Sequence, residues 1–165
     1  MLKKIFSVTL STILLLLASF TNVSADSLEP TEYLGELVSI EYFDNGDTFE
    51  VYLSDPEDIT LTSLLPDSIN STNFITKTKT GYFKNASGGI LWTVSIQGTF
   101  WYNGTTSECT SYVPSAKSYS TYWTINSVTG TKLGNTASAT ATAIFLSQPY
   151  TKMISISCSP TGVIS

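Results

Sequence analysis

Two Asn-Gly pairs, Asn45-Gly46 and Asn103-Gly104, each lie between segments in which apolar and polar residues alternate. This arrangement is the strongest short-range signal for a two-residue β-hairpin turn, because both turn residues tolerate positive φ. A turn of known length also sets which residues face each other across the two strands. The sequence therefore predicts two antiparallel hairpins, each with a defined register.

The hairpin at residue 103 is expected to have one apolar and one mainly polar face. A two-residue turn places Tyr102 opposite Thr105, Phe100 opposite Ser107 and Gly98 opposite Cys109. The apolar face then holds Val94, Ile96, Phe100, Tyr102 and Cys109. The other face holds Ser95, Gln97, Thr99, Thr106, Glu108 and Thr110, together with two rings, Trp101 and Tyr112. A half-buried antiparallel sheet has this division.

The hairpin at residue 45 is expected to place Tyr42 opposite Phe49, Ile40 opposite Val51 and Val38 opposite Leu53. Its reverse face sets Glu41 against Glu50. Carboxylates placed directly across a ladder repel each other. Charges of this kind also protect an exposed sheet edge from unwanted pairing, which is the plain interpretation of the two glutamates.

Alternation predicts further strands over 74–83, 119–125, 136–145 and 152–159, which makes about eight strands in all. Only residues 58–71, bounded by prolines, indicate a turn or two of helix. Short strands separated by turn signals are typical of two packed antiparallel sheets. We therefore expect an all-β antiparallel sandwich, immunoglobulin-like or related.

The first 25 residues have the pattern of a secretory signal peptide. Lys3 and Lys4 precede a largely apolar run over 5–20, and Val23-Ser24-Ala25 supplies a cleavage site after Ala25. The run is short for a membrane span, so we expect a released extracellular protein with no stable membrane anchor. Residues 26–165 suit one domain, with an acidic, turn-rich segment over 26–73 and the main sandwich body over 74–165.

Two cysteines, Cys109 and Cys158, are present. In an oxidising compartment two thiols usually pair, so a disulfide is expected. A zinc site is the alternative, but two cysteines without histidine supply too few ligands. We expect no cofactor.

Charge is distributed unevenly along the chain. Residues 26–67 contain 12 acidic groups and no basic one, whereas residues 68–165 contain six lysines and one acidic group, Glu108. With six lysines against 13 acidic groups, residues 26–165 carry a net charge of −7. This charge argues against nucleic acid or an anionic membrane as a partner. We expect residues 26–67 to lie against the lysine-bearing strands, in the same molecule or in a neighbouring one.

Histidine is absent, which removes the base that serine and cysteine nucleophiles commonly use. A carboxylate pair, as in glycoside hydrolysis, is the remaining enzymatic alternative: Glu41 with Glu50, or Glu108 with an acidic partner. Asp44 and Asp47 could join these groups in binding a cation, although DNGDTFE does not match an EF-hand loop. We expect no enzymatic activity.

Four rings, Trp92, Phe100, Tyr102 and Trp123, fall on inward positions and are expected in the core. Trp101 and Tyr112 fall on the outward face beside Gln97 and Glu108, where they form a candidate site for an extracellular glycan or peptide. The alternative is that another layer covers them. A third interpretation is structural, because the row from Thr136 to Thr142 suits edge-to-edge assembly.

The order Cys109, Trp123, Cys158 resembles the Cys, Trp, Cys pattern of immunoglobulin domains, in which the ring packs on a disulfide between sheets. More broadly, the N-terminal segment, WTVSIQGTFWYNG and ISCSPTG resemble the small secreted cysteine-bridged β-proteins of Gram-positive bacteria. The resemblance implies a bacterial extracellular protein and no particular activity.

Overall fold

The computed structural model describes residues 35–55 and 73–165, which belong to one compact unit. The expected signal peptide over 1–25 and the expected helical turn over 58–71 lie outside the described residues. Within the described ranges no helix is present, and none therefore is long and apolar enough to cross a membrane.

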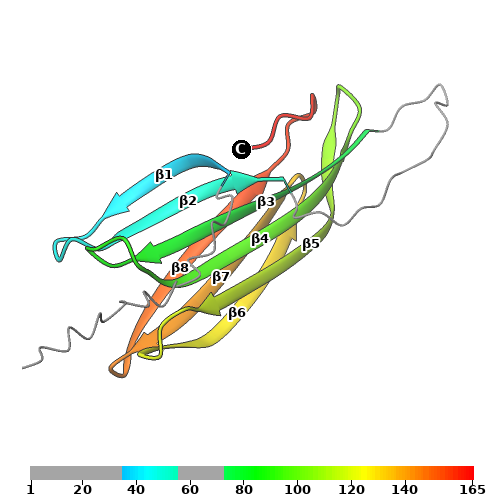
Figure 1. Ribbon diagram of the computed structural model, residues 1–165. Coiled ribbons are helices and arrows are strands. Elements are labelled where there is room, and N and C mark those ends of the chain that lie inside the picture. Colours follow the sequence, from blue (N-terminus) through cyan, green and yellow to red (C-terminus); the bar gives the residue numbers. More distant parts are fainter. Residues whose placement is uncertain (1–34, 56–72) are drawn as a thin grey trace, which may run out of the picture. The chain divides into compact units, whose positions relative to one another are not determined.

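Over the described ranges, eight antiparallel strands form two sheets, which confirms the all-β expectation. The larger sheet contains β1 (Glu36–Tyr42), β2 (Thr48–Ser54), β3 (Asn73–Lys84), β4 (Ile90–Tyr102) and β5 (Ser107–Ser118) in that order. The smaller sheet contains β6 (Trp123–Leu133), β7 (Thr136–Phe145) and β8 (Gln148–Ser157). Figure 1 shows the smaller sheet lying across β3, β4 and β5.

Each sheet is a simple meander, because every strand pairs with its neighbours in sequence and the chain changes sheet once, between β5 and β6. Immunoglobulin sandwiches instead interleave strands between their sheets through Greek-key connections. The resemblance suggested by the two cysteines and Trp123 therefore does not extend to the topology.

The core lies between the two sheets. Large side chains come from the larger sheet, where Trp92, Val94, Ile96 and Phe100 are fully buried. The facing strand β7 contributes small residues along most of its inward face, at Ala137, Ala139, Ala141 and Ala143, and a ring, Phe145, at its end. Large residues opposite small ones let two layers interdigitate closely. Trp92, Phe100 and Trp123 are buried as expected, and Tyr102 packs half-buried on the same core.

The hairpin at residue 45 exists, but its predicted register is wrong by one position. The Gly46 amide donates to the Phe43 carbonyl at 2.9 Å and the Phe43 amide to the Asp47 carbonyl at 3.0 Å. The turn is thus a type I turn followed by Gly46 at φ 84°, which needs three loop residues where two were expected. Glu41 consequently faces Phe49. Glu41 and Glu50 lie on opposite faces of the sheet.

The hairpin at residue 103 also exists with a longer loop. Tyr102 pairs with Ser107 and Phe100 with Cys109, so the loop covers 103–106. Gly98 faces Tyr112, not Cys109 as predicted. The register shifts again between Thr99 and Phe100, which leaves Thr110 as an extra residue in β5.

This β-bulge changes which side chains of β5 point inward. Lys132 holds the bulge, because its Nζ donates to the Cys109 and Thr110 carbonyls, both at 3.0 Å. Beyond the bulge Tyr112 lies on the inward face, where it packs half-buried against the core. The prediction that Tyr112 faces outward is therefore wrong.

Two further expectations fail for topological reasons. Residues 119–122 are a turn between β5 and β6, not part of a strand. The row from Thr136 to Thr142 lies on β7, which is the central strand of the smaller sheet and has no free edge. Edge-to-edge assembly through this row is therefore excluded.

The expected disulfide is absent, and Cys109 and Cys158 are free, buried thiols. The two sulfur atoms point to different backbone carbonyls: Cys109 Sγ donates to Ser111 and Cys158 Sγ to Ser159, each at 3.3 Å. Burial raises the pKa of both thiols. Backbone hydrogen bonds tie both cysteines to the loop between β6 and β7. The Cys109 amide donates to the Gly134 carbonyl, and the Cys158 amide donates to the Asn135 carbonyl.

The expected contact between the acidic segment and the lysine-bearing strands is confirmed for residues 35–55. Three ion pairs occur among the described residues: Lys77 with Asp55, Lys84 with Glu50 at 2.5 Å and Lys152 with Glu41 at 2.7 Å. Each joins a carboxylate of the segment to a lysine of a later strand. The remainder of the acidic segment lies outside the described residues.

Candidate functional site

Four loops meet at one end of the sandwich, where β1, β3, β5 and β7 all end (Figure 1). They are the loops over 43–47, 85–89, 119–122 and 146–147. A pocket of about 530 Å³ lies among them. Clefts of roughly 300–1,000 Å³ are the size that small organic ligands occupy.

Aromatic rings form most of the pocket wall. Phe83 and Trp123 are 3% and 7% exposed, with ring centroids 5.4 Å apart. Phe145 stacks on Trp123 at 5.1 Å, with planes inclined by 18°. Tyr150 meets Trp123 edge-on at 5.0 Å. These rings hold each other in place, so the wall is set before a ligand arrives.

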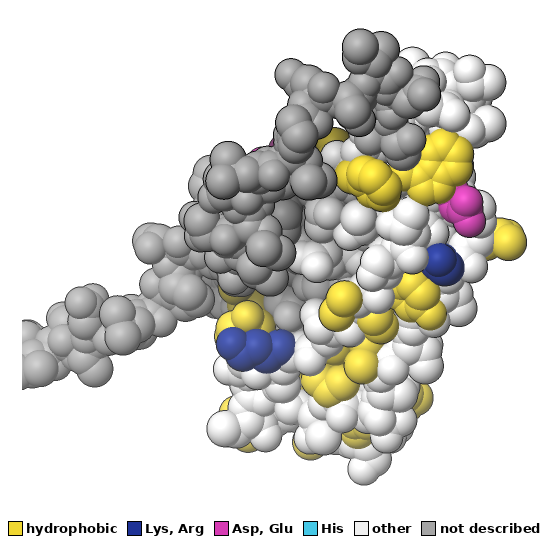
Figure 2. Space-filling view, turned by 90° about the vertical axis from the view of Figure 1, so that its right-hand side faces the viewer, with side chains coloured by type: hydrophobic (Ala, Val, Ile, Leu, Met, Phe, Trp, Pro, Cys, Tyr) yellow, Lys and Arg dark blue, Asp and Glu magenta, His cyan; other side chains and the backbone are white. Residues whose placement is uncertain are grey.

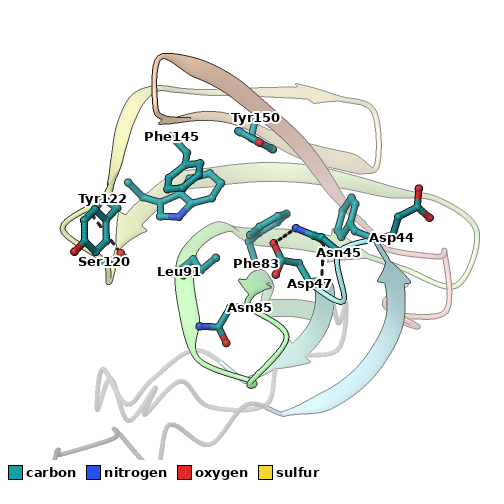
Figure 3. A pocket seen from close by; sticks show the side chains of 12 residues that line it. Asp44, Asn45, Asp47, Phe83, Asn85, Leu91, Ser120, Tyr122, Phe145 and Tyr150 are labelled. Atoms are coloured by element: carbon teal, nitrogen blue, oxygen red, sulfur yellow. Dashed lines mark hydrogen bonds between the residues drawn. The ribbon is translucent and has the colours of Figure 1, made fainter.

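Other rings stand at the mouth of the pocket. Tyr122 is 76% exposed, and Phe43 lies half-buried 5.3 Å from Phe83. Figure 3 shows Tyr122 at one side of the pocket and Phe145 with Tyr150 at another. Exposed rings grouped around a hollow differ from the scattered single rings of an ordinary surface.

Trp92 supports the wall from behind. Its ring stacks on Phe83 at 5.8 Å and lies 6.3 Å from Trp123. Its Nε1 is the buried side-chain polar atom without a hydrogen-bond partner among the described residues. A buried donor left unpaired costs about 1–3 kcal/mol, which the surrounding ring contacts offset.

Polar groups from the turns line the remaining side. Asn45 Nδ2 donates to Asp47 Oδ2 at 2.8 Å, and Asn45 Oδ1 accepts from the Asp47 amide at 3.1 Å. In the next loop Asn85 Oδ1 accepts from the amides of Ser87 and Gly89. These bonds fix the loop backbones and hold polar side chains beside the rings (Figure 3).

Of the residues that the structure describes, two carboxylates, Asp44 and Asp47, line the pocket, and no lysine does. Lys152 contacts one of these rings, because its Nζ lies 4.6 Å from the centre of the Phe43 ring. Its charge is paired with Glu41. Figure 2 shows one face of the molecule, on which few charged side chains stand among hydrophobic and other uncharged groups.

The residues proposed from the sequence are not all brought together. Trp101, Gln97 and Glu108 lie on the outer face of the larger sheet, as predicted. Trp101 pairs across the strands with Glu108 and with Phe74, which is 65% exposed. Tyr112 lies on the inner face, so the four-residue set is divided between the two sides of the sheet.

The carboxylates proposed from the sequence as a catalytic pair, Glu41 and Glu50, also lie apart. Glu41 pairs with Lys152, whereas Glu50 accepts from Lys84 and from Tyr52 at 2.6 Å. Burial acts to raise the pKa of Glu50, but the hydrogen bonds from Lys84 and Tyr52 outweigh burial and lower it. Burial and the Glu50 bond raise the pKa of Tyr52 to about 12. The described residues contain no group of three or more potential metal ligands.

One buried lysine was not singled out from the sequence. Lys79 is on the inward face of β3, is 8% exposed and donates to the Ser155 carbonyl of β8 at 2.9 Å. Burial lowers its pKa. It crosses from one sheet to the other, and its inward position follows from the alternation that also buries Phe83 and Gly81.

The pocket itself was missed from the sequence. Its rings all lie in a loop or within three residues of one, at Phe43, Phe83, Tyr122, Trp123, Phe145 and Tyr150. Aromatic residues next to turns are the signal that could have indicated it. Their convergence depends on how two sheets stack, which strand patterns do not define.

Comparisons with protein-family models, with curated proteins and with solved structures find no match to this chain.

Proposed function

We propose that this protein is a secreted, non-catalytic module that binds an extracellular glycan in the pocket at the loop end of the sandwich. The observation that carries the proposal is the pocket wall, in which buried rings and exposed rings surround an open space of about 530 Å³. The signal pattern over 1–25 supports an extracellular location, and the resemblance to exported proteins of Gram-positive bacteria supports a bacterial origin.

Aromatic walls with adjacent amides and hydroxyls suit sugars for a physical reason. A sugar ring has an apolar C–H face that packs on an aromatic ring, and hydroxyl groups at its rim that need hydrogen-bond partners. Phe145 and Tyr150 supply ring surface, whereas Asn85 and Ser120 supply polar groups. Both requirements are met within one pocket.

Binding without catalysis agrees with the placement of the acidic groups. Cleavage of a glycosidic bond needs two carboxyl groups that flank the bond, about 5–9.5 Å apart. Glu41 and Glu50 lie on opposite faces of the sheet, and Glu108 lies on β5 near the other end of the sandwich. Asp44 and Asp47 are the pocket carboxylates, and Figure 3 shows Asp44 directed away from the rings.

A second candidate surface is the outer face around Trp101. Its supporting observation is the adjacency of Trp101 to exposed Phe74 and to Glu108. This surface is a face of the larger sheet, whereas the loop-end pocket is lined by residues of several loops and strands. An extended glycan or a peptide strand would be the occupant that suits it.

Retention on insoluble bacterial cell-wall polysaccharide tests the proposal and separates the two surfaces. Tyr122→Ala and Tyr42→Ala remove the same side chain at positions that are 76% and 75% exposed, but only Tyr122 lines the pocket. We expect Tyr122→Ala to reduce retention at least tenfold and Tyr42→Ala to leave it unchanged.

The surface around Trp101 is tested in the same assay with Trp101→Ala. We expect the polysaccharide to retain this variant as it retains the wild-type protein. Loss of retention in Trp101→Ala with normal retention in Tyr122→Ala would transfer the function to the outer face. No retention of the wild-type protein on any glycan, together with concentration-dependent oligomers in size-exclusion chromatography, would favour a self-assembling protein instead.

A further inference from the structure

The charges at the loop-end pocket indicate what kind of ligand it prefers. We infer that the pocket binds an organic ammonium group, such as the free amine of an unacetylated amino sugar or a choline-type substituent. This inference rests on the proposed function, because it specifies the group that the pocket recognises.

The first observation is an excess of negative charge at the pocket. Asp44 and Asp47 line it, and no lysine in the described part of the chain does. The three ion pairs among the described residues use Asp55, Glu50 and Glu41, so neither pocket aspartate is neutralised by a lysine there. A cationic ligand would gain from this field, and an anionic ligand would be repelled.

The second observation is the arrangement of the rings. Phe83 and Trp123 are inclined by 49°, Trp123 and Tyr150 by 62°, and Phe83 and Tyr150 by 59°. Beside these packed rings, Tyr122 and Tyr150 are 76% and 39% exposed and present accessible ring surface at the same pocket. Aromatic cages of this kind bind quaternary and methylated ammonium ions, because each ring face attracts the positive charge.

One ring at the pocket mouth, Phe43, already contacts a cation in the folded chain. Lys152 Nζ lies 4.6 Å from the Phe43 ring centre and 5.1 Å from that of Phe49. Because Glu41 pairs with this ammonium at 2.7 Å, its charge is largely balanced and does not cancel the field of the pocket aspartates.

The carboxylate that we assign to the ligand is Asp47. Figure 3 shows its carboxylate beside Phe83 on the side of the ring cluster, whereas Asp44 is directed away. Asp47 is half-buried and Asp44 is exposed, so Asp47 acts with less screening by water. Asn45 holds the Asp47 carboxylate through one oxygen, Oδ2, at 2.8 Å.

Two matched pairs of small molecules test the inference. Choline is compared with 3,3-dimethylbutan-1-ol, which has the same shape without charge, and glucosamine with N-acetylglucosamine. Binding is followed by the fluorescence of the pocket tryptophan and by calorimetry. We expect the charged member of at least one pair to bind at least tenfold more tightly, and we expect this preference to decline with added salt. The pair that shows the preference identifies the source of the ammonium group.

Asp47→Asn keeps the acceptor for Asn45 and removes the charge, so we expect it to abolish the preference. Asp44→Asn is the matched control and should retain most of it. Equal binding of charged and neutral members by the wild-type protein would overturn the inference while leaving a neutral-glycan pocket intact. A wild-type protein that binds neither these molecules nor soluble cell-wall oligosaccharides would overturn the proposed function as well.

Discussion

Lys152 on β8 donates to the carboxylate of Glu41 on β1 at 2.7 Å, and this contact joins the edge strands of the two sheets. The partners are 111 positions apart in the sequence. The ammonium group also lies over the Phe43 ring at the pocket mouth. One contact therefore links the acidic hairpin, the smaller sheet and the wall of the candidate site.

Replacing Lys152 with methionine should destabilise the fold only slightly. The Glu41 side chain is 54% exposed, so water screens the ion pair and limits its contribution to about 0–1 kcal/mol. The cation–π contacts add about 0.5–1 kcal/mol. Urea unfolding at low and high salt measures the difference, and the ion-pair part should shrink with salt. A loss above about 3 kcal/mol would mean that the pair is effectively buried.

Gly98→Ala should destabilise the protein by about 1–3 kcal/mol through overpacking. A Cβ at this position would lie 2.6 Å from the Phe100 ring and 3.2 Å from Ile156 of the opposite sheet. Gln97→Ala, on the outward face next to it, is the control and should cost less than about 1 kcal/mol. Thermal unfolding of both variants provides the comparison. Equal small losses of stability in the two variants would show that the Phe100 ring does not cover Gly98.

The turn between β7 and β8 uses residues poorly suited to it. Leu146 and Ser147 both have positive φ, at 48° and 65°, in a two-residue hairpin loop where Asn-Gly is preferred. Positive φ costs ordinary residues about 1–2 kcal/mol each. The double substitution Leu146→Asn with Ser147→Gly should therefore raise the free energy of unfolding by about 1–2 kcal/mol, measured by urea unfolding. A decrease would mean that exposed Leu146 makes a stabilising contact.

Stability should decline at both extremes of pH through the Tyr52–Glu50 pair. The pKa of Tyr52 rises from 10 to about 12 on folding, so its contribution is complete below pH 10 and is lost as pH rises towards 12. The pKa of Glu50 is lowered on folding, so its contribution is present above pH 4.5 and is lost as pH falls through the lowered value.

Unfolding free energies of Tyr52→Phe and Glu50→Gln across pH check these two losses. Tyr52→Phe should flatten the alkaline decline, and Glu50→Gln should flatten the acid one. Unchanged profiles in both variants would show that the pair does not couple folding to pH.

Strand content and the inward positions were predictable because they depend on local alternation. Val94, Ile96 and Phe100 are buried as their spacing predicts. The registers were not predictable from Asn-Gly alone, because the same dipeptide also suits longer loops that place glycine at the last position. At residue 45 this difference of one position separates Glu41 from Glu50.

The bulge at Thr110 had no local signal. It is stabilised by Lys132 from another sheet, so it is a tertiary feature. Its effect was to place Tyr112 inward and divide the predicted site. The pocket was missed for a related reason, because its rings lie in or near separate loops that meet only when the sheets stack. Alternation predicts which side chains share a face of a sheet. Which residues meet at the end of a sandwich depends on how the two sheets stack.

Mapping a bound oligosaccharide onto the backbone amides by NMR tests the central claim most directly. With a soluble cell-wall oligosaccharide, the account predicts that chemical-shift changes concentrate in the loops over 43–47, 85–89 and 119–122 and at Phe145 and Tyr150. Changes that concentrate instead at Phe74, Trp101 and Glu108, with the loop-end amides unaffected, would contradict it.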